Sequence, residues 1–141
     1  MKSMSREEWR AFLVTSRRTA KVATVRPDGR PHVAPVWFDL DGDELIFTTW
    51  HASVKGRDLR RDPRISLCVD DERPPFSFVV IEGTASLSDN LDEVRAWATR
   101  IAGRYMGAMR AKAYGARNGV PGELLVRVTP THVVAQSAVA E

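Results

Sequence analysis

The chain has 141 residues, a length that predicts a single domain spanning residues 1–141. A hydrophobic fraction of 43% and a charged fraction of 28% exclude a disordered or fibrous chain, and no apolar run reaches the roughly 18 residues that a membrane span needs. The first residues carry no apolar block, so we expect no secretory signal and a cytoplasmic protein. The formal net charge of +3 indicates an anionic partner without naming one.

Metal and nucleic-acid binding are not expected. The only cysteine is Cys68, and the three histidines, His32, His51 and His132, do not have the spacing of metal ligands. The basic residues form no stripe interleaved with aromatic side chains, which is the usual pattern of a nucleic-acid surface.

The first part of the chain predicts a helix followed by a meander of strands. Ser5 and Glu8 match a capping box, so a helix is expected over Ser5–Leu13. Three strands separated by glycine turns are then expected at Lys21–Val25, Pro31–Leu40 and Glu44–Thr49. Pro35 cannot donate to a sheet ladder, which predicts an edge strand or a bulge there.

The remainder predicts more short strands with helices between them. Helices are expected at Ser53–Arg61, at Leu91–Tyr105 with Asn90 as its cap, and at Met106–Arg117. Strands are expected at Ile65–Val69, at Phe76–Leu87 with a bulge at Gly83, and at Glu123–Val128 and Thr131–Gln136. Short, numerous antiparallel strands favour a mainly β fold, a small barrel with flanking helices.

The segment from Phe47 to Lys55 has the features of a phosphate site. A strand ends in Thr48 and Thr49, and a helix begins at Ser53, with Lys55 two residues further on. Free N–H groups and the positive end of the helix dipole would favour an anion there. The alternative is that Ser53 only caps the helix and that Lys55 is solvated.

Two further features bear on the ligand. Arg57, Arg60, Arg61 and Arg64 follow Lys55 closely and would form an electropositive rim, or simply offset the negative end of the helix dipole. The interrupted strand around Pro35, beside Trp37 and Phe38, is a place where a flat ring could meet the backbone. The chain has no nucleophile elbow, P-loop or zinc signature, so an enzyme of this sequence would depend on a cofactor.

Three stretches, PVWF, FTT and SVKGRDLRRDPR, carry a resemblance to a known family. The chain resembles the split β-barrel flavin and deazaflavin reductases of the pyridoxamine 5′-phosphate oxidase superfamily, and within it the small actinobacterial branch that depends on coenzyme F420. The resemblance implies an FMN-binding split β-barrel and a homodimer with cofactor sites at its interface. It also implies hydride transfer from the reduced deazaflavin to an electron-poor double bond of a small organic substrate.

The resemblance also implies roles for individual residues. The residues along the deazaflavin or flavin ring would be Pro35, Val36 and Trp37. Phe78 would also approach this ring, from the same subunit or from its partner. Those at the ribityl chain and phosphate would be Thr48, Thr49, Ser53, Val54 and Lys55. Arg57 and Arg60 would meet the polyglutamate tail that distinguishes the deazaflavin from FMN. His32 stands where flavin-binding relatives often carry a phosphate-binding arginine, which weighs against FMN.

Two other functions stay open at this point: an FMN-dependent oxidoreductase of the same fold, and a cofactor-binding protein without catalysis. The chain ends in THVVAQSAVAE rather than in the tail that holds pyridoxal phosphate in the oxidases, so vitamin B6 oxidation is not expected. No catalytic residue is identified. Tyr105 and His51 are candidate proton donors, with packing or surface roles as the alternative.

Overall fold

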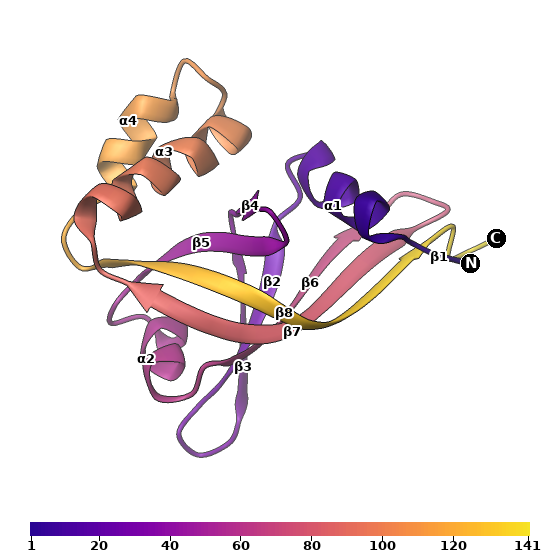
Figure 1. Cartoon of the computed structure of the whole chain (residues 1–141), viewed down its shortest axis with the longest axis horizontal. Helices are drawn as coiled ribbons and strands as arrows, with labels where there is room; N and C mark the ends of the chain where they lie inside the picture. Colours follow the sequence, from indigo (N-terminus) through magenta and orange to yellow (C-terminus); the bar gives the residue numbers. More distant parts are fainter.

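The computed structural model describes all 141 residues and consists of one antiparallel sheet with four helices. The strands are β1 (Lys2–Ser3), β2 (Ala20–Val25), β3 (Pro31–Val36), β4 (Asp39–Asp41), β5 (Glu44–Trp50), β6 (Arg64–Asp71), β7 (Ser77–Ser88) and β8 (Glu123–Ser137). The helices are α1 (Arg6–Thr15), α2 (Val54–Arg61), α3 (Leu91–Met106) and α4 (Ala111–Asn118). The strand order is β3-β2-β6-β7-β8-β5-β4, with β1 added to β8 (Figure 1).

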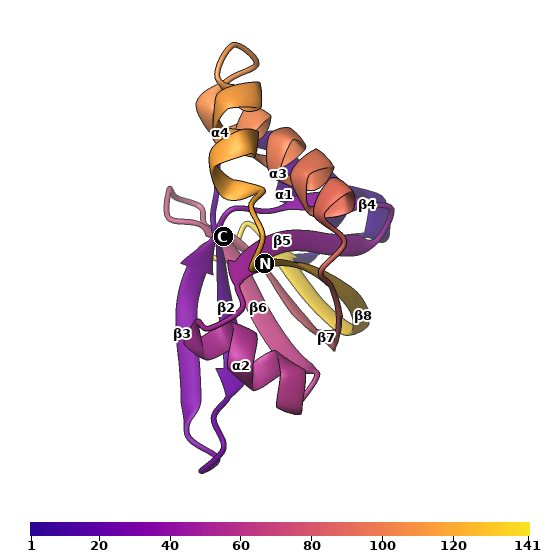
Figure 2. The same cartoon turned by 90° about the vertical axis from the view of Figure 1, so that its left-hand side faces the viewer.

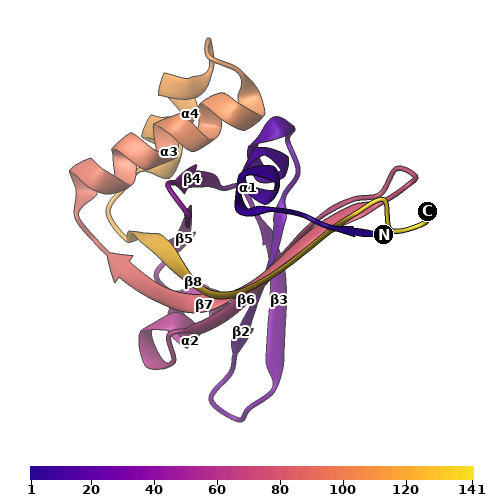
Figure 3. The same cartoon turned by 45° about the vertical axis from the view of Figure 1, so that its right-hand side comes forward.

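The connection between β3 and β4 shows how the sheet curls. These strands lie at opposite ends of the strand order, yet only Trp37 and Phe38 separate them in the chain. The sheet must therefore bend until its two edges approach each other, which gives the predicted split β-barrel with flanking helices (Figure 3). The predicted meander is wrong at this point, because the expected strand Pro31–Leu40 is divided between the two edges. Pro35 lies on the edge strand β3, as predicted.

The C-terminal strand β8 is continuous, whereas the sequence predicts two strands. It pairs with β7 along nearly its whole length, and the register shifts between Glu82 and Gly83, where Thr131 is the extra residue. β5 pairs with β8 only as far as Val128. Between Val128 and Gln136, where β1 joins, β8 pairs with β7 alone. The missing N–H of Pro130 therefore falls at a bulge in a stretch paired on one side and does not end the strand. The predicted irregularity at Gly83 is confirmed.

The helix ends follow the sequence signals. Ser5 and Glu8 form the predicted capping box of α1, and the Asn90 side chain accepts a hydrogen bond from the Glu93 N–H at the start of α3. Gly107 has a φ of 90° and ends α3, so the next helix begins at Ala111 and not at Met106. α4 packs on α3, which in turn covers β5 and β8.

The core fills the barrel with aliphatic and aromatic side chains. Phe38, Phe47 and Leu67 are among its largest fully buried members. None of the four helices combines the length and the apolar character that crossing a bilayer requires.

Candidate functional site

A cavity of about 280 Å³, here called the central cavity, collects most of the predicted site residues. Its walls come from the end of β3, the end of β5, the start of β8, the start of α2 and the α3–α4 pair. In Figure 2, α3 and α4 lie at the top of the molecule, and α2 lies beside the lower part of the strands. The lining residues predicted from the sequence are Pro35, Val36, Trp37, Thr48, Thr49, Ser53 and Lys55. The others are Trp50, Ala98, Ile101, Asn118 and Glu123.

The hydroxyl of Ser53 is fully used in fixing the start of α2. It donates to the Trp50 carbonyl (2.7 Å) and accepts from the Gly56 N–H (3.1 Å). The Thr49 hydroxyl lies 2.9 Å from the same oxygen and, since the Ser53 hydrogen is already donated, it donates in this contact. One hydrogen and two lone pairs exhaust what a hydroxyl can offer. The interpretation of Ser53 as a helix cap is therefore confirmed.

The backbone next to this cap keeps two free donors. The N–H groups of Val54 and Lys55 have no backbone acceptor and no side-chain partner. A Cβ at Gly56 would lie 2.6 Å from the Trp50 carbonyl oxygen, so only glycine lets the first turn of α2 approach the preceding loop this closely. Unpaired N–H groups at a helix start, beside a lysine, are a ready site for an anion.

One acid and one base line the central cavity. Lys55 and Glu123 are both half-buried, and burial lowers the pKa of Lys55 and raises the pKa of Glu123, each partly offset by the charge of the other. Glu123 reaches the cavity because it pairs with Trp50 across β5 and β8. The sequence analysis missed Glu123, since only this strand pairing brings it near Lys55.

Trp37, which lines the central cavity, belongs to a cluster of aromatic rings. Trp37 stacks on Tyr105 with ring centroids 5.0 Å apart and an interplanar angle of 3°, and Tyr114 lies against it at 6.4 Å. The Tyr105 hydroxyl donates to the Arg18 carbonyl (2.7 Å) and accepts from the Phe38 N–H (3.3 Å). Burial raises the pKa of Tyr105. Tyr105 thus braces Trp37 and does not itself line the cavity.

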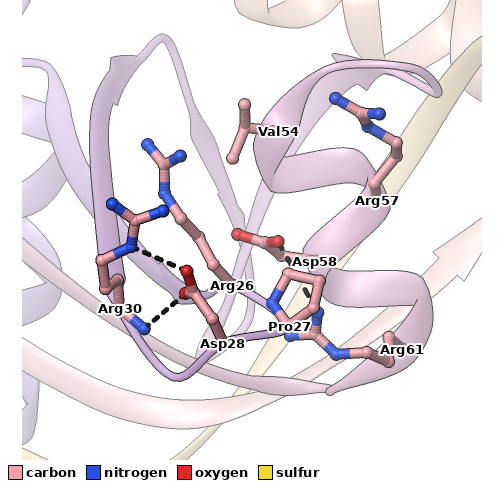
Figure 4. Close-up of a pocket in the computed structure, with 8 residues that line it drawn as sticks. All are labelled: Arg26, Pro27, Asp28, Arg30, Val54, Arg57, Asp58 and Arg61. Atoms are coloured by element: carbon pink, nitrogen blue, oxygen red, sulfur yellow. Dashed lines mark hydrogen bonds and ion pairs between the residues drawn. The ribbon is translucent and has the colours of Figure 1, made fainter.

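A second cavity, here called the arginine cavity, lies on another face of α2 and has a volume of about 410 Å³. Figure 4 shows it between the β2–β3 hairpin and α2. The hairpin contributes Arg26, Pro27, Asp28 and Arg30, and the helix contributes Val54, Arg57, Asp58 and Arg61. Two of the arginines are held by acids: Arg30 lies 2.8 Å from Asp28, and Arg61 lies 3.9 Å from Asp58.

Asp58 anchors the helix beneath this cavity. It is 3% exposed, and its carboxylate accepts from the Thr24 hydroxyl of β2 at 2.8 Å. The sequence analysis did not single out this pair, because nothing in the local pattern shows that α2 packs over β2. Arg26 and Arg57 form no ion pair, so their charges are available to a ligand.

The structure leaves the other predicted site residues outside the central cavity. Val54 and Arg57 line the arginine cavity, while His32 and Arg60 line neither. The His32 Nδ1 atom is buried without a hydrogen-bond partner. Phe78 lines a separate cavity beside Cys68, so within one chain it does not join Trp37.

Comparisons with known proteins agree with this architecture. The sequence model of the family described as pyridoxamine 5′-phosphate oxidase matches residues 5–137. A conserved hypothetical protein from Mycobacterium tuberculosis superposes with a TM-score of 0.86 at 27% identity, over 96% of this chain and 86% of the other. An F420 reductase superposes with a TM-score of 0.71 at 26% identity, over 87% of this chain and 94% of the other.

The fold is also shared more widely. A heme storage protein from Vibrio cholerae superposes with a TM-score of 0.72 at 18% identity, over 98% of this chain and all of the other; this similarity concerns the fold alone. The barrel and the family match define a split β-barrel protein. The chain belongs to the pyridoxamine 5′-phosphate oxidase family.

Proposed function

We propose that the protein is an oxidoreductase that uses the deazaflavin coenzyme F420 and binds it in the central cavity. The observation that carries the proposal is the unpaired N–H group of Lys55, next to that of Val54 at the start of α2, in a cavity that is also lined by apolar and aromatic side chains. A flavin-type cofactor needs this combination, since it joins a flat ring to a phosphate. The F420 reductase with the same fold supports the choice of cofactor.

The phosphate fits the start of α2. The two N–H groups, the Lys55 ammonium and the positive end of the helix dipole would all attract an anion. The Thr48 side chain lines the same cavity, and its hydroxyl has no partner within the protein, so it is free to donate. Ser53 would act indirectly, by holding the helix start in place.

The ring fits the wall formed by Pro35, Val36 and Trp37. Proline offers no N–H of its own, and Val36 and Ile101 add apolar side chains to the lining of the cavity. When bound, the reduced deazaflavin supplies a hydride for an electron-poor double bond. The protein's part is to orient the ring, brace it through Trp37 and Tyr105, and keep water away from its face.

The arginine cavity would hold the anionic tail of the cofactor. It shares α2 with the phosphate site, and Arg57 and Arg26 have no acidic partner. A flexible tail that leaves the phosphate at the start of α2 could therefore reach two unpaired guanidinium groups. Arg60 lies outside both cavities and has a smaller part in this arrangement than Arg57.

We also propose that two copies of the chain form a homodimer that completes the site. Val33, Trp50 and Phe76 are 65%, 45% and 40% exposed, and burying such side chains against a second chain would favour association. A second chain would also bring another Phe78 toward the ring. Sedimentation equilibrium should give a dimer, and a monomer at the concentrations used for binding would contradict the proposal.

A fluorescence titration with coenzyme F420, with F420 lacking its glutamate tail, and with FMN tests the choice of cofactor. Tightest binding of the intact deazaflavin, weakened when the tail is removed, supports the proposal and the role of the arginine cavity. Preference for FMN would make the protein a flavin oxidoreductase of the same fold. Tight F420 binding without turnover of any enone, quinone or tetrapyrrole would favour a cofactor-binding protein without catalysis.

A further inference from the structure

Glu123 places a negative charge in a cavity assigned to an anion. It is the only acid among the residues that line the central cavity, and Lys55 is the only base. The two do not form a direct ion pair, since their charged atoms are not within 4.0 Å of each other. Burial raises the pKa of Glu123, whereas the charge of Lys55 lowers it.

Because the cavity is small, the negative charge of Glu123 acts on any anion bound in it. Groups on the walls of one 280 Å³ cavity lie within about one Debye length of each other, which is about 8 Å at physiological salt, so their interaction is not screened away. An anion bound in this cavity beside the Lys55 N–H group would therefore be repelled by Glu123. The repulsive energy grows in proportion to the charge of the anion.

Phosphomonoesters and phosphodiesters carry different negative charges at neutral pH. A phosphomonoester carries about −1.5 to −2 at pH 7, whereas a phosphodiester carries one negative charge. The ammonium of Lys55 and the carboxylate of Glu123 leave the side chains of the cavity without net charge. A singly charged phosphate therefore leaves one negative charge unbalanced, and a doubly charged phosphate leaves two.

We propose that Glu123 is a specificity-determining residue that disfavours terminal phosphomonoesters relative to phosphodiesters in the central cavity. This inference rests on the proposed function, because it takes the cavity to be a phosphate site. FMN ends in a phosphomonoester, and the phosphate of coenzyme F420 is a diester that continues into the tail. Glu123 would thus select the deazaflavin at the phosphate, independently of the arginine cavity.

The test compares three ligands whose phosphate charge is zero, one and two: riboflavin, coenzyme F420 and FMN. Dissociation constants are measured by fluorescence at pH 7.5 for the wild type, for Glu123→Gln and for Glu7→Gln. Glu7 is an exposed acid on α1 without an ion pair, so its variant controls for the change in net charge. Each ligand is compared only with itself between variants, which removes the differences in intrinsic affinity among the three ligands.

The expected result is a graded gain in affinity. Glu123→Gln should bind FMN about tenfold more tightly and F420 about threefold more tightly, with riboflavin unchanged, since the repulsion on a dianion is about twice that on a monoanion. Glu7→Gln should change none of the three constants. Glu123 is half-exposed at the first position of β8; Glu123→Ala should give the same gradient and guards against an effect particular to glutamine.

Two outcomes would overturn the inference, and they can be told apart. If Glu123→Gln changes the dissociation constants of all three ligands equally, or changes none of them, Glu123 does not discriminate by the charge of the phosphate. The proposed function stands in that case. A wild-type protein that binds neither F420 nor FMN contradicts the proposed function itself, and the inference falls with it.

Discussion

The two cavities on either side of α2 differ in almost every chemical respect. The central cavity combines one lysine and one glutamate with an apolar and aromatic wall, whereas the arginine cavity has four arginines and two aspartates. Lys55 faces the first, while Val54, Asp58 and Arg61 line the second. Neighbouring residues of a helix point in directions about 100° apart. A helix of eight residues can therefore contribute to a cavity with one lysine and one glutamate and to another that is rich in arginine.

The largest effect is expected where α2 is held against the preceding loop. Gly56→Ala would place a Cβ 2.6 Å from the Trp50 carbonyl oxygen; overpacking of this kind costs about 1–3 kcal/mol and would displace the N–H groups of the first turn. We expect a lower free energy of unfolding in urea and weaker cofactor binding. Gly103→Ala is the control, because its Cβ would meet only the Ala111 side chain at 3.5 Å and should stabilise α3 by about 0.5–1 kcal/mol. Equal behaviour of both variants would show that the close approach at Gly56 is unimportant.

The second effect concerns the anchor beneath the arginine cavity. Thr24→Val removes the donor to the buried Asp58 carboxylate, and a buried acceptor left without its partner costs about 1–3 kcal/mol. The loss should appear in urea unfolding while the affinity for the cofactor ring remains. Thr84→Val, an exposed position on β7, is the control and should change little. If Thr24→Val were neutral, the Thr24–Asp58 bond would not be what fixes α2 to β2.

A third effect separates packing from catalysis on the aromatic wall. Tyr105→Phe removes a hydroxyl that is bonded to Arg18 and Phe38, so we expect about 1 kcal/mol of destabilisation in thermal melts and an unchanged rate of cofactor oxidation by a substrate. Tyr114→Phe, whose hydroxyl has no such partners, should alter neither. A large fall in rate with intact stability would make Tyr105 the proton donor after all.

The smallest effect is expected on the charged side of α2. Arg57→Ala should weaken binding of the intact deazaflavin by about 0.5–1 kcal/mol at low salt, which is the usual contribution of an exposed ion pair. The difference from the wild type should shrink as salt is added, because salt screens exposed charges. Arg60→Ala is the control, since Arg60 lies outside both cavities. Equal losses for the two variants, or a loss that also appears with the tail-free cofactor, would argue against a tail site in the arginine cavity.

The sequence predicts the parts of this molecule that depend on local signals. The helix caps at Ser5, Ser53 and Asn90 and the bulge at Gly83 all follow from short patterns, and all are present. The cluster from Pro35 to Lys55 is also brought together as expected, because β3, β5 and α2 are close in the chain. These features need no knowledge of the distant part of the sheet.

The features that the sequence does not predict depend on long-range pairing. The division of the strand at Trp37 follows from the closure of the barrel, which places β3 and β4 at opposite edges. Glu123 enters the central cavity only through the pairing of β8 with β5, and Asp58 becomes buried only because α2 covers β2. No local pattern of residues carries this information.

The central claim is that the start of α2 binds the cofactor phosphate, and Lys55→Ala tests it most directly. Loss of a hydrogen bond to a charged group should weaken binding of coenzyme F420 by about 1.5–3 kcal/mol. Lys112→Ala, at an exposed position on α4, should leave the dissociation constant unchanged and controls for the loss of a positive charge. A fluorescence titration of the three proteins side by side gives the answer. An unchanged dissociation constant in Lys55→Ala would contradict the account.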